Sequence, residues 1–274
     1  MSEKPELRFE GGRIAENYDE VMVPVLFEPW AEQLLGTLPP EPDWDVLDLA
    51  TGTGVAASKL AARLGSAGSL TAADLSPDML AVAERRVRAV AGDTPVRFAL
   101  GPAHPLALKD ASFDALYCQQ GFQFFPDGGA AAAEMHRVLR PGGKVALSAW
   151  CPLSECDLFG SIADGLREIG EEEAAARMGA PFDHMPRATL EGHFRAAGFD
   201  GVSVERVERD LVFDGGIEHA HRFLDASPIG PVLRELSEEK SAVFRARFDA
   251  ESEPRTRDGV TRGAMASLVL TAGR

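Results

Sequence analysis

Short apolar segments alternate with segments of helical spacing from residue 45 to residue 150, and this alternation constrains the fold more than any other feature. The apolar segments predict five strands, at 45–50, 69–74, 96–101, 113–120 and 144–150. The segments between them predict helices at 55–65, 76–92 and 128–143, the second with Ser76 as N-cap and Pro77 at its first position. Strands joined by helices favour right-handed crossovers and a mostly parallel sheet covered on both faces. The chain is therefore predicted to be a doubly wound, Rossmann-like α/β protein.

The remaining segments predict additions to this sheet. Residues 14–36 have apolar positions at helical spacing, interrupted by prolines, and predict two or three short helices. After Trp150 the order expected is a helical insertion at 151–188, a helix at 189–199, a strand at 201–213, helices within 216–250 and a last strand at 263–273. The expected sheet has seven strands, mostly parallel with the last antiparallel, and helical insertions after strands 5 and 6.

The stretch VLDLATGTGVAA, residues 46–57, places a carboxylate at the end of the first strand and small residues directly after it. Gly52 to Ala57 fits the GxGxxA spacing of dinucleotide sites, and Asp74 lies where a ribose-binding acid would stand. Asp48, however, would repel the pyrophosphate that such a turn receives. S-adenosylmethionine has no phosphate but carries an ammonium group and a sulfonium, so the carboxylate favours that cofactor.

These residues resemble a known family. Asp48–Leu49–Ala50–Thr51–Gly52–Thr53–Gly54 is similar to the first motif of the class I S-adenosylmethionine-dependent methyltransferases, an acid followed by GxGxG. Alanine at the first glycine occurs in the ubiquinone and menaquinone C-methyltransferases and their relatives. AADLSPDMLAVAERR, FDALYCQQGFQFFPD and EMHRVLRPGGKVALSAW resemble the later motifs, so the likeness covers about residues 14–150 in order.

The resemblance implies a division of the chain and a set of cofactor-binding residues. Residues 1–40 would form an N-terminal helical lid, 41–150 the cofactor-binding core, and 151–274 the rest of the same sheet with substrate-recognition insertions, all in one domain. Asp74 would bind the ribose hydroxyls, Leu75 an adenine face, and Gln119 and Gln120 would lie beside the sulfonium. The full cofactor set implied is Tyr18, Asp48, Ala50, Thr51, Gly52, Gly54, Asp74, Leu75, Pro102, Ala103, Gln119 and Gln120.

One position departs from the family pattern. After the third strand the family often has Gly-Asp-Ala, whose aspartate accepts the adenine amino group, and this chain has Gly101-Pro102-Ala103. The proline ring could cover an adenine face, and the Ala103 amide could donate to a ring nitrogen. We expect weaker or less base-selective cofactor binding than in relatives that have the aspartate.

Methyl transfer in line from a sulfonium depends on orientation and needs a base only when the acceptor must lose a proton. Among the six histidines, His184 in the insertion is the candidate catalytic residue, and no metal site is expected. The residues expected to face the substrate are Phe27, Trp30, Gln123, Trp150 and Phe182. Phe159, Phe194, Phe223, Leu224 and Leu233 would add apolar lining. We therefore expect a small, largely apolar organic acceptor, methylated on oxygen or carbon.

Composition limits the partners. The net charge of −15 and pI near 4.9, without a basic run, argue against a nucleic acid partner. Three cysteines without a CxxC pair, a polar N-terminal stretch and no apolar run of membrane-spanning length favour the cytoplasm and no membrane span. A homodimer is left open. Two alternatives also stay open, a non-catalytic protein that binds S-adenosylmethionine or S-adenosylhomocysteine, and an NAD-dependent oxidoreductase.

Overall fold

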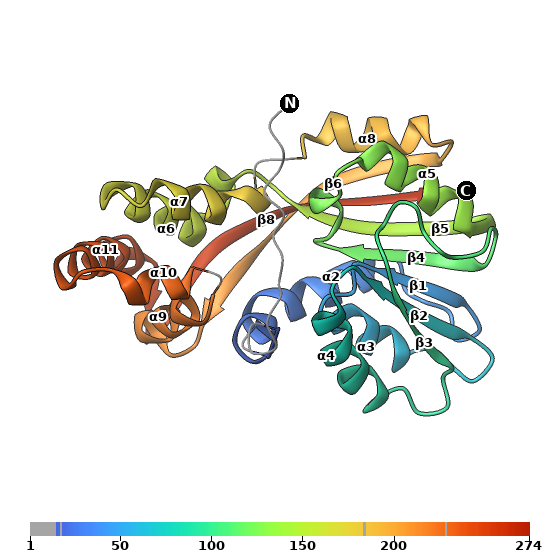
Figure 1. Ribbon diagram of the computed structural model, residues 1–274, viewed down its shortest axis with the longest axis horizontal. Coiled ribbons are helices and arrows are strands. Elements are labelled where there is room, and N and C mark those ends of the chain that lie inside the picture. Colours follow the sequence, from blue (N-terminus) through green and yellow to red (C-terminus); the bar gives the residue numbers. More distant parts are fainter. Residues whose placement is uncertain (1–14, 17, 183–184, 228) are drawn as a thin grey trace.

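A single mixed sheet organises the chain in the computed structural model, which describes residues 15–16, 18–182, 185–227 and 229–274. The strands run in the order β3-β2-β1-β4-β5-β8-β6 (Figure 1). Their bounds are β1 Asp45–Leu49, β2 Ser69–Asp74, β3 Val96–Leu100, β4 Phe113–Gln119, β5 Leu139–Trp150, β6 Asp200–Phe213 and β8 Val260–Gly273. β8 pairs antiparallel with both of its neighbours, and β1 to β5 pair in parallel. The doubly wound sheet with an antiparallel last strand is confirmed.

An eighth strand was not predicted. β7 (Thr256–Arg257) pairs with the start of β8 through a two-residue turn at Asp258 and Gly259. Both turn residues have positive φ, 50° and 75°, as a type I′ hairpin turn requires. The hairpin therefore follows from the Asp-Gly pair, and the strand is too short to have a period of its own.

Helices cover both faces of the sheet, because alternate strand residues are apolar on each face. α5 (Gly128–Val138) and α8 (Arg187–Ala196) pack on the face that carries Leu47, while α2 (Glu28–Thr37) and α3 (Val55–Ala61) pack on the face that carries Val46. α4 (Pro77–Arg88) follows β2 and begins as predicted, with the Ser76 side chain accepting a hydrogen bond from the Met79 amide at 3.3 Å.

The predicted helix at 128–143 was wrong in its last turn, because the helix ends at Val138 and β5 begins at Leu139. Leu139 pairs with Phe113 of β4, and the Arg140 guanidinium binds Asp45 at 2.7 Å and Asp114. Buried packing and these ion pairs hold the segment extended and override its helical spacing.

β5 and β6 are each followed by helices that form a second group of elements, away from β1–β4 (Figure 1). The helices are α6 (Asp157–Glu168) and α7 (Glu172–Gly179) after β5, and α9 (Gly216–Ala226), α10 (Gly230–Glu235) and α11 (Glu238–Ser252) after β6. Together with the ends of β5, β6 and β8 they enclose their own buried apolar cluster. The expected insertions after strands 5 and 6 are confirmed.

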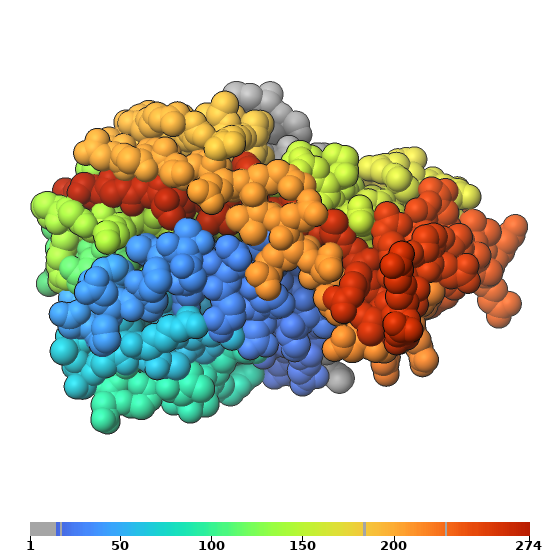
Figure 2. Space-filling view, turned by 180° about the vertical axis from the view of Figure 1, so that it is seen from behind, coloured from blue at the N-terminus to red at the C-terminus, as the bar shows by residue number. Residues whose placement is uncertain are grey.

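The N-terminal segment lies between these two groups. It forms η1 (Tyr18–Phe27), wound as a π-helix, and then α2, with Pro29 in the first turn of that helix rather than as an interruption. Figure 2 shows this segment, in blue, against the orange elements, and η1 contacts both α9 and β6. Ion pairs fix the segment to the core, from Lys59 to Glu28 at 2.9 Å and from Arg86 to Asp19 at 2.7 Å.

Candidate active site

The end of β1, next to the glycine loop that follows it, holds a carboxylate that lacks a full set of partners. Asp48 is 1% exposed, and its Oδ2 accepts a hydrogen bond from the Thr51 hydroxyl at 2.6 Å. Its Oδ1 is buried and has no hydrogen-bond partner among the described residues. Burial, together with the nearby Asp74 carboxylate, raises the pKa of Asp48 to about 7. A cation beside this loop would give Oδ1 a partner and would stabilise the ionised form of the buried carboxylate.

The second carboxylate closes the loop from the neighbouring strand. Asp74, at the end of β2, accepts from the Gly52 amide at 2.8 Å and from the Ser76 amide at 2.9 Å. Burial raises the pKa of Asp74, although these amides act in the opposite direction. Each oxygen of the carboxylate has a second lone pair, so both can still accept a ligand hydroxyl.

Backbone conformation at this loop explains its small residues. Gly52 and Gly54 have φ of 55° and 81°, and a Cβ at Gly54 would lie 2.9 Å from the Ala83 backbone. Ala50 also has a positive φ, 58°, at the position where the family motif has glycine. Its Cβ lies against Gly121, where an added Cβ would be only 2.6 Å away. The alanine at position 50 therefore depends on the glycine at position 121.

We expect Gly121→Ala to lower the free energy of unfolding by about 1–3 kcal/mol, as overpacking in a core does. In the double variant Ala50→Gly/Gly121→Ala the clashing methyl is gone, so part of this loss should return, although Cys118 Sγ stays 3.1 Å from the new methyl. Urea unfolding of both variants and of Ala50→Gly measures the coupling. Strictly additive effects would contradict the assigned contact.

Apolar side chains are exposed where the resemblance places adenine. Leu75 is 64% exposed and Leu100, opposite Asp74 in the ladder, is 61% exposed. Pro102 is also exposed, whereas Ala103 packs against the core. Leu100 was missed in the sequence, although it lies at the end of a predicted strand and so at the ligand edge of the sheet.

We expect Pro102→Asp to bind S-adenosylhomocysteine about tenfold more tightly, which is the effect of one added hydrogen bond of about 1.4 kcal/mol. The new carboxylate would supply the adenine contact that the resemblance implies is missing. Calorimetric titration measures the change, with Pro102→Ala as the control that removes the ring and adds no acceptor. Equal affinity of the aspartate variant and the parent would reject the assignment of this loop to adenine.

The end of β4 and the turn that follows it, which includes η2 (Phe122–Phe124), carry three glutamines. Gln119 donates through Nε2 to the Phe27 carbonyl at 2.7 Å, so it ties the N-terminal segment to the end of β4. Gln120 donates to Ser267, and Gln123 accepts from the Trp150 amide. Gln120 has a positive φ, 51°, which turns the chain sharply at the end of the strand.

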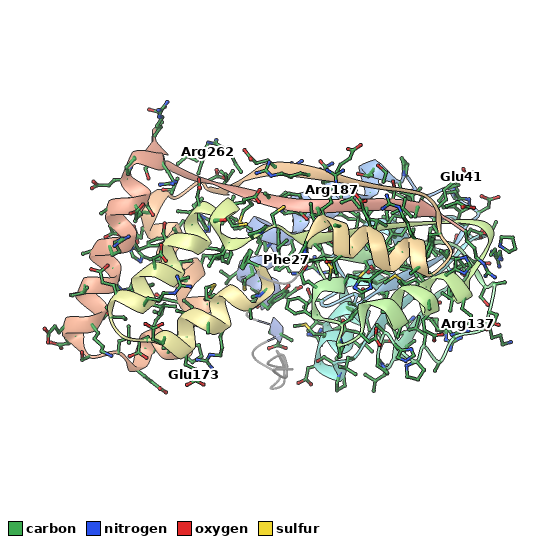
Figure 3. All side chains as sticks on the ribbon, turned by 90° about the horizontal axis from the view of Figure 1, so that it is seen from above. Phe27, Glu41, Arg137, Glu173, Arg187 and Arg262 are labelled. Atoms are coloured by element: carbon green, nitrogen blue, oxygen red, sulfur yellow. The ribbon has the colours of Figure 1, made fainter. Side chains whose placement is uncertain are left out.

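An aromatic cluster extends from this turn into the second group of helices. It consists of Phe27, Trp30, Trp150, Phe159 and Phe182, which includes four of the five residues expected to face the substrate. The Trp30 and Trp150 rings meet edge to face with centroids 5.4 Å apart, and Phe182 lies 6.1 Å from Trp150. In Figure 3 Phe27 lies between the two groups of elements.

Tyr18 connects this cluster to the loop. Its ring is 5.0 Å from that of Phe27, and burial raises its pKa well above the usual value, with the Asp74 carboxylate raising it further. Of the expected lining residues, Phe223 and Leu224 are buried in the same apolar cluster of the second group. Phe194 is not, because α8 packs beside α5 and turns this ring toward Phe122 and Phe199. The structure therefore does not bring Phe194 to the aromatic cluster.

The candidate catalytic residue His184 lies outside the described residues. Four other histidines have packing or ion-pair partners: His136 contacts Phe199, His193 contacts Phe122, His219 contacts Phe213 and His221 pairs with Asp249. Within the part of the chain that the structure describes, no group of three or more His, Cys, Asp or Glu side chains could hold a metal ion. The same part contains no helix long and apolar enough to cross a membrane.

Comparison with known proteins shows which family the chain resembles. A methyltransferase domain matches residues 46–143. Nocamycin O-methyltransferase of Saccharothrix syringae is 32% identical over 211 residues, which cover 73% of each chain. Demethylmenaquinone methyltransferase of Deinococcus radiodurans is 42% identical over 117 residues, 43% of this chain and 47% of that one. The chain thus spans about half the length of this second relative.

A solved structure agrees on the fold. Phosphoethanolamine N-methyltransferase 2 of Haemonchus contortus, in complex with S-adenosyl-L-methionine, has a TM-score of 0.62 and covers all of this chain and 60% of its own, at 16% identity. The strand order and the acid-glycine loop are those of α/β proteins, which as a class bind their ligands at the carboxyl edge of the sheet. The chain belongs to the class I S-adenosylmethionine-dependent methyltransferases, and part of it is similar to the ubiquinone and menaquinone C-methyltransferases. Its cofactor is S-adenosylmethionine rather than a dinucleotide, which the GxGxxA spacing alone would also fit.

Proposed function

We propose that the protein transfers a methyl group from S-adenosylmethionine to a small, largely apolar organic acceptor, on oxygen or carbon, by in-line displacement. One observation carries the proposal. The turn at residues 120–123 touches Ala50 of the glycine loop on one side and the backbone of Trp150, in the aromatic cluster, on the other. A methyl donor on the loop and an apolar acceptor on the cluster would therefore meet at this turn.

The loop has the groups that the cofactor needs. Asp74 can accept from the ribose hydroxyls, and the exposed faces of Leu75 and Leu100 can cover the adenine. The unpartnered Oδ1 of Asp48 suits a ligand ammonium group close to the loop. When bound, the cofactor supplies an electrophilic methyl group on a sulfonium.

The contribution of the chain itself would be orientation and exclusion of water. Holding two reactants in line can lower a barrier by roughly 7–11 kcal/mol. The aromatic cluster would give an apolar acceptor one flat orientation, and the docked N-terminal segment would keep water from the loop. In this proposal residues 41–150 bind the cofactor, while the segment 1–40 and the insertions select the acceptor.

Two relatives are named for small acceptors, one for a nocamycin oxygen and one for demethylmenaquinone, which supports an organic molecule of similar size. The acidic balance of the chain supports a partner other than nucleic acid. Three free thiols support a cytoplasmic location as part of the proposal.

Thermal unfolding with excess S-adenosylhomocysteine, S-adenosylmethionine or NAD is the first test. A ligand at a hundred times its dissociation constant adds about 2.7 kcal/mol to the native state, so a clear rise in Tm is expected with the first two ligands only. Transfer of labelled methyl to a panel of phenols, enols and quinones then tests catalysis. Cofactor binding without transfer to any acceptor would favour the non-catalytic alternative, and a rise with NAD alone would reject the proposal.

A further inference from the structure

Three of the four glutamines in the chain stand at positions 119, 120 and 123. Gln120 is 4% exposed and Gln123 is 1% exposed, yet each has one amide atom without a hydrogen-bond partner. These atoms are Oε1 of Gln120 and Nε2 of Gln123. Buried polar atoms are nearly always hydrogen-bonded. Two unpaired amide atoms in one short turn therefore indicate that a bound ligand supplies their missing hydrogen-bond partners.

The network around them fixes which atom is free. The Ser267 hydroxyl donates to the Ala149 carbonyl at 2.8 Å, so its oxygen accepts Nε2 of Gln120 at 3.1 Å and leaves Oε1 as a free acceptor. The Trp150 backbone amide can only donate, and it donates to Oε1 of Gln123 at 3.1 Å. That contact leaves Nε2 of Gln123 as a free donor.

Both amides are anchored beside the aromatic cluster. Trp150 and Ser267 are direct partners in the antiparallel β5–β8 ladder, so their Cα atoms lie roughly 5 Å apart and their side chains share one face. The Trp150 ring on that face belongs to the cluster. Gly121, between the two glutamines, contacts Ala50 of the cofactor loop. The free acceptor and the free donor thus lie between the cofactor loop and the apolar site.

We infer that Gln120 and Gln123 select the methyl acceptor, with Gln120 accepting from a hydroxyl and Gln123 donating to a carbonyl of the same molecule. The inference rests on the proposed function and narrows its substrate to a flat phenol or enol that carries a second, carbonyl oxygen. Both amides are uncharged, so they offer no counter-charge to a carboxylate or phosphate, and neutral acceptors are favoured.

Three matched compounds test the inference by calorimetry on the chain saturated with S-adenosylhomocysteine. 7-Hydroxy-1-tetralone has both groups, too far apart to bond to each other, 1-tetralone has only the carbonyl, and 5,6,7,8-tetrahydro-2-naphthol has only the hydroxyl. The hydroxyketone should bind about tenfold more tightly than either of the others, as one extra buried hydrogen bond predicts. This comparison needs no variant.

Variants then assign the two contacts. Gln120→Met should weaken binding of the two hydroxyl compounds about tenfold and leave 1-tetralone unchanged, and Gln123→Met should weaken only the two ketones. Gln33→Met, at the glutamine outside the turn, is the matched control and should change none. Equal losses for all three compounds would show a purely structural role. Failure of the hydroxyketone to bind the loaded chain would also overturn the inference, whereas failure of S-adenosylhomocysteine to bind would refute the proposed function beneath it.

Discussion

Asp48→Asn is expected to stabilise the ligand-free protein at about pH 8 and to weaken its binding of S-adenosylmethionine. Burial raises the pKa of Asp48 to about 7 in the folded chain, against about 3.9 when unfolded. The stability that this group contributes is therefore fully present below about pH 4 and is lost as the pH rises through about 7. The difference of about three pH units corresponds to a loss on the order of 4 kcal/mol.

The asparagine variant lacks this titration, so its advantage over the parent should grow between about pH 4 and pH 7 and then level off. Urea unfolding of both proteins across this range measures it, and groups common to both cancel in the difference. Parallel pH profiles would contradict the assigned pKa.

The substitution should affect ligand binding in the opposite way, because it should weaken binding while it stabilises the ligand-free protein. A hydrogen bond to a charged group contributes about 1.5–3 kcal/mol, so we expect the variant to bind S-adenosylmethionine about 10 to 100 times more weakly. Binding to the parent should strengthen as the pH rises toward 7, because the ligand ammonium favours the ionised carboxylate, and the variant should lose this dependence. Calorimetric titration at several pH values measures both. Unchanged affinity would mean that Asp48 acts only within the loop, through Thr51.

Local signals were enough to predict the core of the fold. The strand predicted at 69–74 has the same bounds in the structure, and Ser76 caps the next helix as expected. These elements are specified by their own apolar period and their own turn residues. The start of β5 was not predictable in this way, because Leu139 and Arg140 are held extended by partners in β1 and β4 that no local pattern identifies.

In the candidate site, too, some features follow from local sequence and others depend on partners far away in the chain. Parallel strands end at one edge of a sheet, so the placement of Asp48 and Asp74 together follows from strand prediction alone. The contacts of the glutamines do not, since Gln119 binds Phe27 at a separation of 92 residues and Gln120 binds Ser267 at a separation of 147. For the same reason Phe194 could not be separated in the sequence from the aromatic residues that do meet.

Trp150→Ala is expected to lower the free energy of unfolding by about 3–5 kcal/mol, the usual cost of truncating a buried tryptophan. Trp150 is 4% exposed, and its ring lies within 6.4 Å, between centroids, of those of Phe27, Trp30 and Phe182. It therefore joins the N-terminal segment, the sheet and the insertion. The variant should also raise the KM of an acceptor found in the methyl-transfer panel at least about tenfold, because the surface that orients it is removed.

Phe199→Ala separates these two effects. Phe199 is also 4% exposed, but it packs against Phe194 and His136 on the other face of the sheet. Its truncation should cost a similar 3–5 kcal/mol or so and leave KM for the acceptor unchanged. Urea unfolding and steady-state kinetics, both measured well below the Tm of the weaker variant, give the comparison. If both variants raise KM equally, the change reflects general destabilisation and the aromatic cluster is not the acceptor site; if only Trp150→Ala does, the cluster contacts the acceptor.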